Sequence, residues 1–283
     1  MGIAATLRHP APPHQRLAPP WRPCHPTSAP MPSRPRVRET PTVLRPIVGY
    51  FERRVDPLTN LFLVLPLFGI YHLGVLTQMR HSRQGFTWVG NGMDFLTGTV
   101  LALVHGDILA YTAIAAGVTI LLGLLILRAR RQSSLHPRLF IPVLLESTLY
   151  ALIVASLIGS IVRTFGLGVL DHEGLPAQVI ASCGAGLHEE LVFRMGLFGG
   201  LGYLLSRRMK PWIGWLIALG FSSVLFSAVH YLPPLGDAFS LSSFVFRLLC
   251  GVAFAIIFRL RGFAIAAWTH ALYDIFYFML RHT

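Results

Sequence analysis

The chain has 283 residues, of which 53% are hydrophobic and only 13% are charged, and its net charge is +12. Roughly 25% of the residues of an average soluble domain are charged, and such a domain does not contain several runs of about 20 residues almost free of charge. The composition therefore excludes an ordinary soluble domain and predicts an all-α, polytopic transmembrane helix bundle. Nine of the 24 Lys and Arg residues lie in the first 54 positions and most others flank apolar runs. This placement indicates membrane lipid, and not nucleic acid, as the partner of the positive charge.

The chain begins with a segment crowded with Pro and Arg. Residues 1–40 cannot bury a core, so we predict a disordered tail there. No apolar region follows the early basic residues, which argues against a signal peptide, and Met31 is an alternative start. Residues 41–57 are expected to form a juxtamembrane segment at the membrane surface.

Seven apolar stretches follow, each long enough for a helix that crosses a hydrocarbon core about 30 Å thick. The region 58–135 is expected to hold the N-terminal transmembrane helices, and 139–281 the C-terminal helix core. The apolar stretch Met93–Val104 is too short to span, so we expect it to be re-entrant or interfacial, and an eighth helix stays open. The seven predicted spans are 58–79, 107–127, 139–162, 177–205, 211–231, 241–258 and 262–280.

The loops between these stretches predict their orientation, because Lys and Arg concentrate on the cytoplasmic side of short loops. With the N-terminus inside, the inner loops carry nine basic residues and the outer segments carry four. We therefore predict an inside N-terminus and an outside C-terminus.

The fourth long stretch contains two adjacent acids and an arginine, Glu189, Glu190 and Arg194. Neighbouring residues lie about 100° apart on an α-helix, so the two acids are not expected to share a face. Glu190 and Arg194 are four residues apart and can form an ion pair that neutralises both. Glu189 is then available as a base. The simpler alternative is a stabilising pair beside an exposed acid.

Two further stretches carry polar residues at membrane depth. His230 lies near the outer end of its span, where an interfacial or packed histidine is the plain alternative. His270 and Asp274 are four apart, so Asp274 is expected to orient the imidazole and fix its tautomer, unless the pair only joins helices. An ionisable side chain in hydrocarbon costs roughly 2.5 to 3.5 kcal/mol. We therefore expect these groups to face one another in one site, with Glu146 of the third span as a supporting acid.

One acid and two histidines from three helices suit two chemistries. Glu189 can take a proton from a water that attacks a carbonyl, while the histidines stabilise the oxyanion. Alternatively, Glu189, His230 and His270 can ligate Zn²⁺ with an open fourth position. The residues leave both open. Cys24, Cys183 and Cys250 are isolated and lack the paired spacing of a zinc or disulfide framework.

Two alternative functions belong to other classes of protein: a proton-coupled transporter and a non-catalytic immunity-type membrane protein. A transporter would be expected to show an inverted repeat or a pair of broken helices, and neither is evident in this sequence.

Three ordered motifs resemble those of a known family. Glu189-Glu190-x-x-x-Arg194, Phe226-x-x-x-His230 and His270-x-x-x-Asp274 are similar, in this order, to the motifs of the CPBP intramembrane proteases, which include the CAAX prenyl endopeptidases. The resemblance implies a glutamate-type membrane endopeptidase without a cofactor, supported by Glu190, Arg194 and Phe226. Glu189 would activate water with His230, and His270 and residue 274 would stabilise the oxyanion.

Residue 274 departs from the prenyl endopeptidases, which have Asn where this chain has Asp274. A carboxylate would repel an oxyanion. Asp274 must therefore be protonated, serve by orienting His270, or favour a bound metal.

The resemblance also implies a substrate and a location. The substrate would be a protein or peptide with a membrane-proximal C-terminal tail, and the protein would be a multi-pass protein of a bacterial inner membrane. The predicted topology tilts the site outward, because His230 lies near the outer face. Residues 56–60, the first span and residues 91–94 are similar to bacterial myxosortases, which are proposed to trim C-terminal sorting tails of exported proteins.

Overall fold

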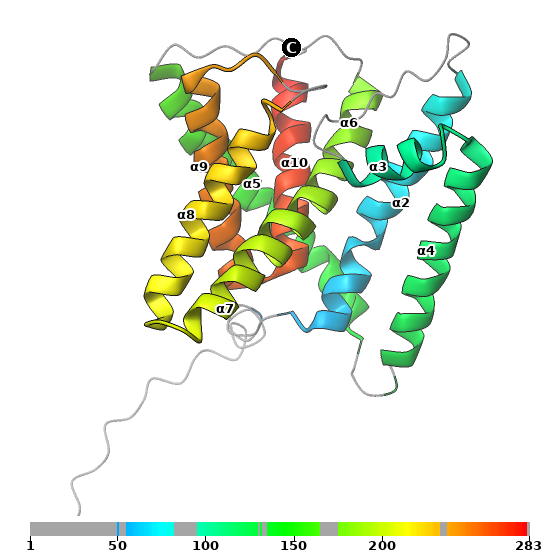
Figure 1. The fold of residues 1–283 in the computed structure, drawn as a ribbon, viewed down its shortest axis with the longest axis horizontal. Helices are drawn as coiled ribbons and strands as arrows, with labels where there is room; N and C mark the ends of the chain where they lie inside the picture. Colours follow the sequence, from blue (N-terminus) through cyan, green and yellow to red (C-terminus); the bar gives the residue numbers. More distant parts are fainter. Residues whose placement is uncertain are drawn as a thin grey trace, which may run out of the picture. The chain divides into compact units, whose positions relative to one another are not determined.

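The computed structural model describes residues 50, 55–81, 95–129, 131, 135–164, 175–232 and 237–281. All of them belong to the compact unit Val48–Thr283. Within these ranges every regular element is a helix and there is no strand, which confirms the all-α polytopic bundle (Figure 1). The predicted tail at 1–40, most of the juxtamembrane segment and residues 91–94 lie outside the described residues.

The described part of the chain is a succession of helices. Three consecutive elements, α6, the π-helix η2 and α7, run on without a break, and we call them together the 175–206 helix. The elements are α2 (Pro57–His81), α3 (Phe95–Leu103), α4 (Ile108–Ala129), the 3₁₀ turn η1 (Pro137–Leu139), α5 (Phe140–Thr164), α6 (Leu175–Gly184), η2 (Ala185–Gly200), α7 (Leu201–Ser206), α8 (Pro211–Val229), α9 (Leu241–Arg261) and α10 (Phe263–Arg281).

Each predicted span coincides with a helix in the described part of the chain. Five segments are long and apolar enough to cross a membrane: Pro57–Thr77, Ile108–Ala129, Pro137–Ile158, Pro211–Val229 and Leu241–Arg261. The other two predicted spans correspond to the 175–206 helix and α10, which carry the first and third polar motifs. The nine residues of α3 reach only about 13 Å, too short to span.

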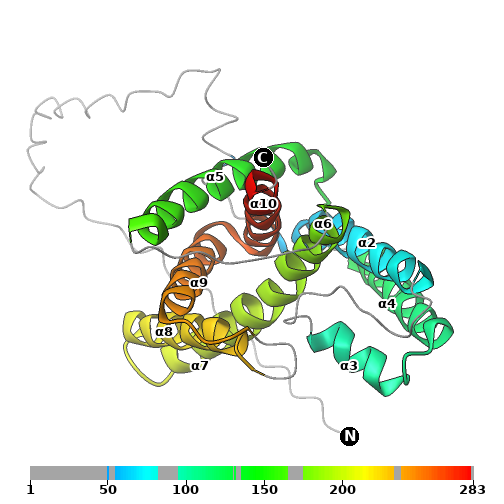
Figure 2. The same ribbon diagram turned by 90° about the horizontal axis from the view of Figure 1, so that it is seen from above.

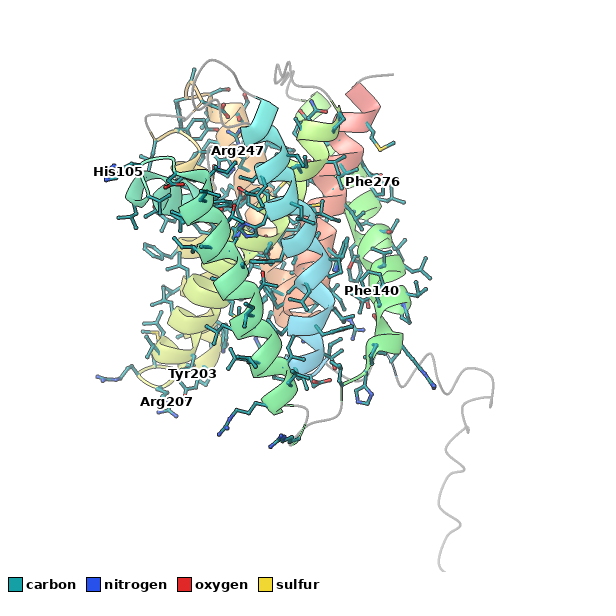
Figure 3. The ribbon with its side chains drawn as sticks, turned by 90° about the vertical axis from the view of Figure 1, so that its right-hand side faces the viewer. His105, Phe140, Tyr203, Arg207, Arg247 and Phe276 are labelled. Atoms are coloured by element: carbon teal, nitrogen blue, oxygen red, sulfur yellow. The ribbon has the colours of Figure 1, made fainter. Side chains whose placement is uncertain are left out.

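The connections alternate between the two ends of the bundle as the loop charges predict. Figure 1 shows the N-terminus of α2 at the same end as the α4–α5, α7–α8 and α9–α10 connections. The nine basic residues predicted for the inner side lie in these connections or in the helix ends beside them, and Arg207 lies at this end in Figure 3. The placement of this end in the cytoplasm remains a prediction.

α10 is surrounded by other helices. It packs against α5, α9, α2 and the 175–206 helix, and Figure 2 shows it with α5, α6 and α9 around it. A run of small side chains makes this packing close, since Ala264, Ala266, Ala267 and Ala271 are fully buried. Gly186 crosses this run, because a Cβ atom there would lie 2.6 Å from the carbonyl oxygen of Ala267.

The start of α10 is fixed by a tight turn and an amide clamp. Gly262 alone separates α9 from α10, with φ at +103°, a conformation that favours glycine. The side chain of Asn60 accepts a hydrogen bond from the Ala264 amide at 2.8 Å and donates to the Val55 carbonyl at 2.6 Å. α2 thereby holds the first turn of α10, and with it the depth of His270 in the bundle.

Candidate active site

The π-helix η2 carries the first motif. Its hydrogen bonds run from i to i+5, a rare geometry that recurs at functional sites. Residues 182–190 are buried without interruption, because α2, α8, α9 and α10 pack against this part of the chain. Glu189, Glu190 and Arg194 are almost fully shielded from solvent. Such ionisable groups need partners inside the protein.

Glu190 contacts two partners at once. Its Oε2 lies 3.2 Å from Nε of Arg194, which is the ion pair expected from the spacing of four residues. Its Oε1 lies 2.9 Å from Nδ1 of His270 on α10. The Arg194 guanidinium also covers the ring of Phe226 at 4.1 Å from its centroid. A cation over an aromatic face gains further stabilisation when water is excluded.

Glu189 faces the opposite edge of the same imidazole. Its Oε2 lies 3.9 Å from Nε2 of His270. The expectation that the two adjacent acids cannot share a face is therefore too strict. The wider π turn reduces the angle between neighbouring side chains, and the ring offers one nitrogen to each acid. His270 thus lies between Glu190 and Glu189.

Asp274 lies on the Nε2 side of His270, with its Oδ2 at 3.6 Å. The sequence predicts that Asp274 orients the ring, but the group that accepts a hydrogen bond from Nδ1 is Glu190 instead. A carboxylate accepts, so Nδ1 carries the proton and Nε2 is the nitrogen that remains for chemistry. Asp274 and Glu189 both face that nitrogen.

Phe254 of α9 holds the flat face of the same ring. Its centroid lies 4.4 Å from that of His270, and the planes differ by 21°. This contact fixes the tilt of the imidazole, while Glu190 fixes its rotation. Sequence reasoning missed Phe254, because one aromatic residue within an apolar stretch gives no signal of such a role.

His230 joins the cluster through Phe226. It caps α8, and its Nδ1 lies 2.7 Å from the carbonyl oxygen of Phe226. A carbonyl only accepts, so Nδ1 donates and Nε2 keeps its lone pair. The Phe226 ring packs edge-on against His230 at 5.2 Å and against His270 at 6.0 Å. Both predicted histidines therefore contact one aromatic ring and lie on the same side of the 175–206 helix as Arg194.

Glu146, the predicted supporting acid, is paired elsewhere. Its carboxylate accepts from Arg261 at 2.6 and 3.1 Å and from the Tyr50 hydroxyl at 2.6 Å. Burial, and then the hydrogen bond to Glu146, raise the pKa of Tyr50, so its hydroxyl stays a donor. This network ties α5 and the end of α9 to residue 50. It contains neither His270 nor the acids of η2.

The zinc alternative requires three ligands around one point. Among the described residues, no group of three or more His, Cys, Asp or Glu side chains is arranged to hold a metal ion. Glu189, His230 and His270 therefore do not form a ready ligand set in this geometry, and we assign no step to a metal.

Comparison with known proteins adds an independent finding. Residues 172–276 match the family model described as type II CAAX prenyl endopeptidase Rce1-like. The matched segment contains all three motifs, from Glu189 to Asp274. No curated protein and no solved structure matches the chain. This match covers less than half of the chain, and it makes the segment that carries the three motifs similar to the Rce1-like type II CAAX prenyl endopeptidases.

Proposed function

We propose that this integral membrane protein is an intramembrane endopeptidase that hydrolyses a peptide bond close to the membrane, in the C-terminal tail of a membrane-anchored or exported protein. The proposed setting is a bacterial inner membrane. The observation that carries the proposal is the imidazole of His270 between two buried carboxyl groups, Glu190 at Nδ1 and Glu189 at Nε2.

In the proposed reaction Glu189 is the general base. It takes a proton from a water molecule whose oxygen forms a bond to the scissile carbonyl carbon, with His230 assisting in placing that water. The carbonyl π electrons move to oxygen and give a tetrahedral oxyanion. When the C–N bond breaks, Glu189 returns its proton to the leaving amine. Protons and electrons balance without a cofactor.

His270 and Asp274 are proposed to stabilise the oxyanion. The Glu190 carboxylate beside Nδ1 supplies a counter-charge, so that a protonated His270 can donate from Nε2. A protonated Asp274 can donate from the same side. Two donors placed in a site without bulk water are effective, since one such donor is worth about 10² to 10³ in rate.

The test is cleavage by the purified protein in liposomes, with candidate membrane-anchored tails as substrates. Glu189→Gln keeps the shape of the side chain and removes the base, and we expect a loss of at least about 10²-fold. The matched control is Asp107→Asn, because residue 107 is exposed and its side chain caps α4, a role that Asn also fulfils. Full activity of Glu189→Gln would overturn the assignment.

The same assay separates the glutamate and metal chemistries. We expect activity to persist in the presence of a chelator. Loss with chelator and recovery with Zn²⁺ would replace the glutamate mechanism with the metal-dependent one.

A further inference from the structure

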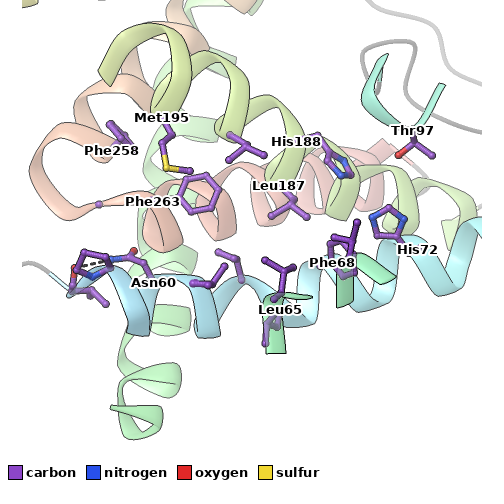
Figure 4. A pocket seen from close by; sticks show the side chains of 18 of the residues that line it. Asn60, Leu65, Phe68, His72, Thr97, Leu187, His188, Met195, Phe258 and Phe263 are labelled. Atoms are coloured by element: carbon purple, nitrogen blue, oxygen red, sulfur yellow. Dashed lines mark hydrogen bonds between the residues drawn. The ribbon is translucent and has the colours of Figure 1, made fainter. Parts of the chain in front are cut away.

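A cavity of about 1080 Å³ lies beside the 175–206 helix, and its lining does not include Glu189, Glu190 or His270. Side chains of α2, α4 and the 175–206 helix form most of its wall. Figure 4 shows His72, His188 and Thr97 at one end of it, and Asn60, Phe258 and Phe263 at the other. The cavity therefore has a long apolar body with polar groups at both ends: His72, His188 and Thr97 at one, and Asn60 with the nearby lining residues Asp56 and Arg259 at the other.

One of the polar ends contains a histidine with an unused nitrogen. Nδ1 of His72 lies 2.7 Å from the hydroxyl of Tyr111. A phenol is the better donor and an imidazole nitrogen the better acceptor, so Tyr111 donates and Nε2 of His72 carries the proton. That N–H is buried, and no described group accepts a hydrogen bond from it. His72 thus presents a donor that requires an acceptor from a ligand.

The apolar body has the length of one lipid chain. Asn60 and His72 lie twelve residues apart on α2, which is about 18 Å along the helix. One leaflet of a hydrocarbon core about 30 Å thick measures about 15 Å. The wall between these two residues is formed by side chains such as Leu65, Phe68 and Leu187. A single extended chain fits this length.

The cavity also has a side opening for such a chain. Four of its lining residues are between 37% and 43% exposed: Ile114, Val118, Leu191 and Met195. They belong to α4, which is long and apolar enough to cross a membrane, and to the 175–206 helix. A lipid chain can therefore enter sideways from the membrane.

We propose that this cavity binds one acyl chain of a membrane ester lipid, with the ester carbonyl accepting a hydrogen bond from Nε2–H of His72. The ester carbonyl distinguishes this ligand from other lipids with a long apolar chain, because it accepts the hydrogen bond from His72. An isoprenoid or ether-linked chain would fill the apolar body but would leave the His72 donor unpaired. The site goes beyond the proposed protease function, because it uses none of the catalytic residues.

The test uses the full protein in detergent and two phospholipid probes with a photoreactive acyl or alkyl chain, one ester-linked and one ether-linked. Crosslinks are mapped by mass spectrometry. We expect the ester probe to label Phe68, Leu191 and neighbouring lining residues about three- to tenfold more than the ether probe, the worth of one neutral hydrogen bond.

Variants locate the effect at His72. In His72→Phe the preference for the ester should disappear, while His72→Gln, which keeps an N–H donor, should retain part of it. Thr119→Val on α4 is the matched control, since residue 119 is exposed and does not line the cavity. A melting curve for each variant shows that the fold is intact.

Three results would overturn the proposal. They are equal labelling by ester and ether probes in the wild type, stronger labelling by an isoprenoid probe, and an unchanged ester preference in a folded His72→Phe variant. Glu189→Gln should label as the wild type does. Failure of the protease mechanism therefore leaves this result unaffected, and failure of lipid binding leaves the protease assay unaffected.

Discussion

Nδ1 of His270 lies 2.9 Å from Oε1 of Glu190, a hydrogen bond between residues eighty positions apart. This bond gives Glu190 a double role, because the same carboxylate also neutralises Arg194. The acid next to it, Glu189, is left to face the other ring nitrogen. One pair of adjacent acids therefore supplies both the group that orients the histidine and the candidate base.

Removal of the Glu190 charge should destabilise the protein and also impair the site. In Glu190→Gln the guanidinium of Arg194 is left buried without its counter-charge, and breaking a buried pair typically costs about 3 to 5 kcal/mol. We expect a large fall in melting temperature and a loss of peptide cleavage. The melting temperature is measured by circular dichroism in detergent.

The control for this prediction is the double variant Glu190→Gln/Arg194→Met, which removes both charges. Its melting temperature should recover toward that of the wild type, while cleavage stays impaired because His270 still lacks its carboxylate partner. A double variant no more stable than the single one would show that Arg194 is not neutralised by Glu190.

The Glu190–Arg194 pair illustrates what the sequence can predict. A spacing of four residues on one helix implies contact, and the ion pair forms. The contact of Glu190 with His270 depends instead on how two distant helices cross, and on a π-helix that the α-helical angle does not describe. Local spacing therefore predicts pairs within a helix, and the packing between helices decides which group orients the histidine.

Gly186 should tolerate no side chain. A Cβ there would lie 2.6 Å from the carbonyl oxygen of Ala267 and 2.7 Å from Cβ of Ala271. Neither atom is at the end of a flexible chain, so Gly186→Ala must push η2 away from α10, which costs about 1 to 3 kcal/mol. The shift separates Glu189 from His270, and a misplacement of about 1 Å can cost 10²-fold in rate.

Gly200 of the same π-helix is the matched control, because a Cβ there meets no atom within 4 Å. Gly200→Ala should leave the melting temperature unchanged or raise it, since Ala favours helices by up to about 1 kcal/mol over Gly. Equal melting temperatures and cleavage rates for the two alanine variants would contradict the close crossing at Gly186.

Glu146 should matter for stability and not for catalysis. Its carboxylate is held by Arg261 and Tyr50, outside the His270 cluster. Glu146→Gln leaves the Arg261 charge poorly paired, so we expect a lower melting temperature together with near wild-type cleavage below that temperature. A folded Glu146→Gln variant with cleavage reduced 10²-fold would instead give this acid a part in the reaction.

The pairing of Glu146 also marks a limit of sequence reasoning. An acid at membrane depth without an oppositely charged residue three or four positions away on its own helix is interpreted as a candidate for the active site. Its partner Arg261 lies 115 positions away, at the inner end of α9, where a positive charge is also explained by membrane topology. Only the packing of α5 against α9 reveals that the two charges neutralise each other.

Asp274→Asn should separate the possible roles of residue 274. If Asp274 acts as a protonated donor toward the oxyanion, the amide of Asn replaces it, and the variant should match the wild type in cleavage at the acid end of the pH range in which Glu189 is still ionised. As pH rises, Asp274 loses its proton and repels the oxyanion, so wild-type activity should fall while that of Asp274→Asn persists. Asp274→Ala removes the donor and should lose about 10² to 10³-fold at every pH. The measurement is a pH profile of kcat/KM for the three proteins, with Glu189→Gln as the inactive reference.

If the carboxylate itself were required, to orient His270 or to hold a metal, Asp274→Asn would be impaired across the whole range. Because Glu190 already holds Nδ1 of His270 in this structure, we expect the neutral amide to suffice.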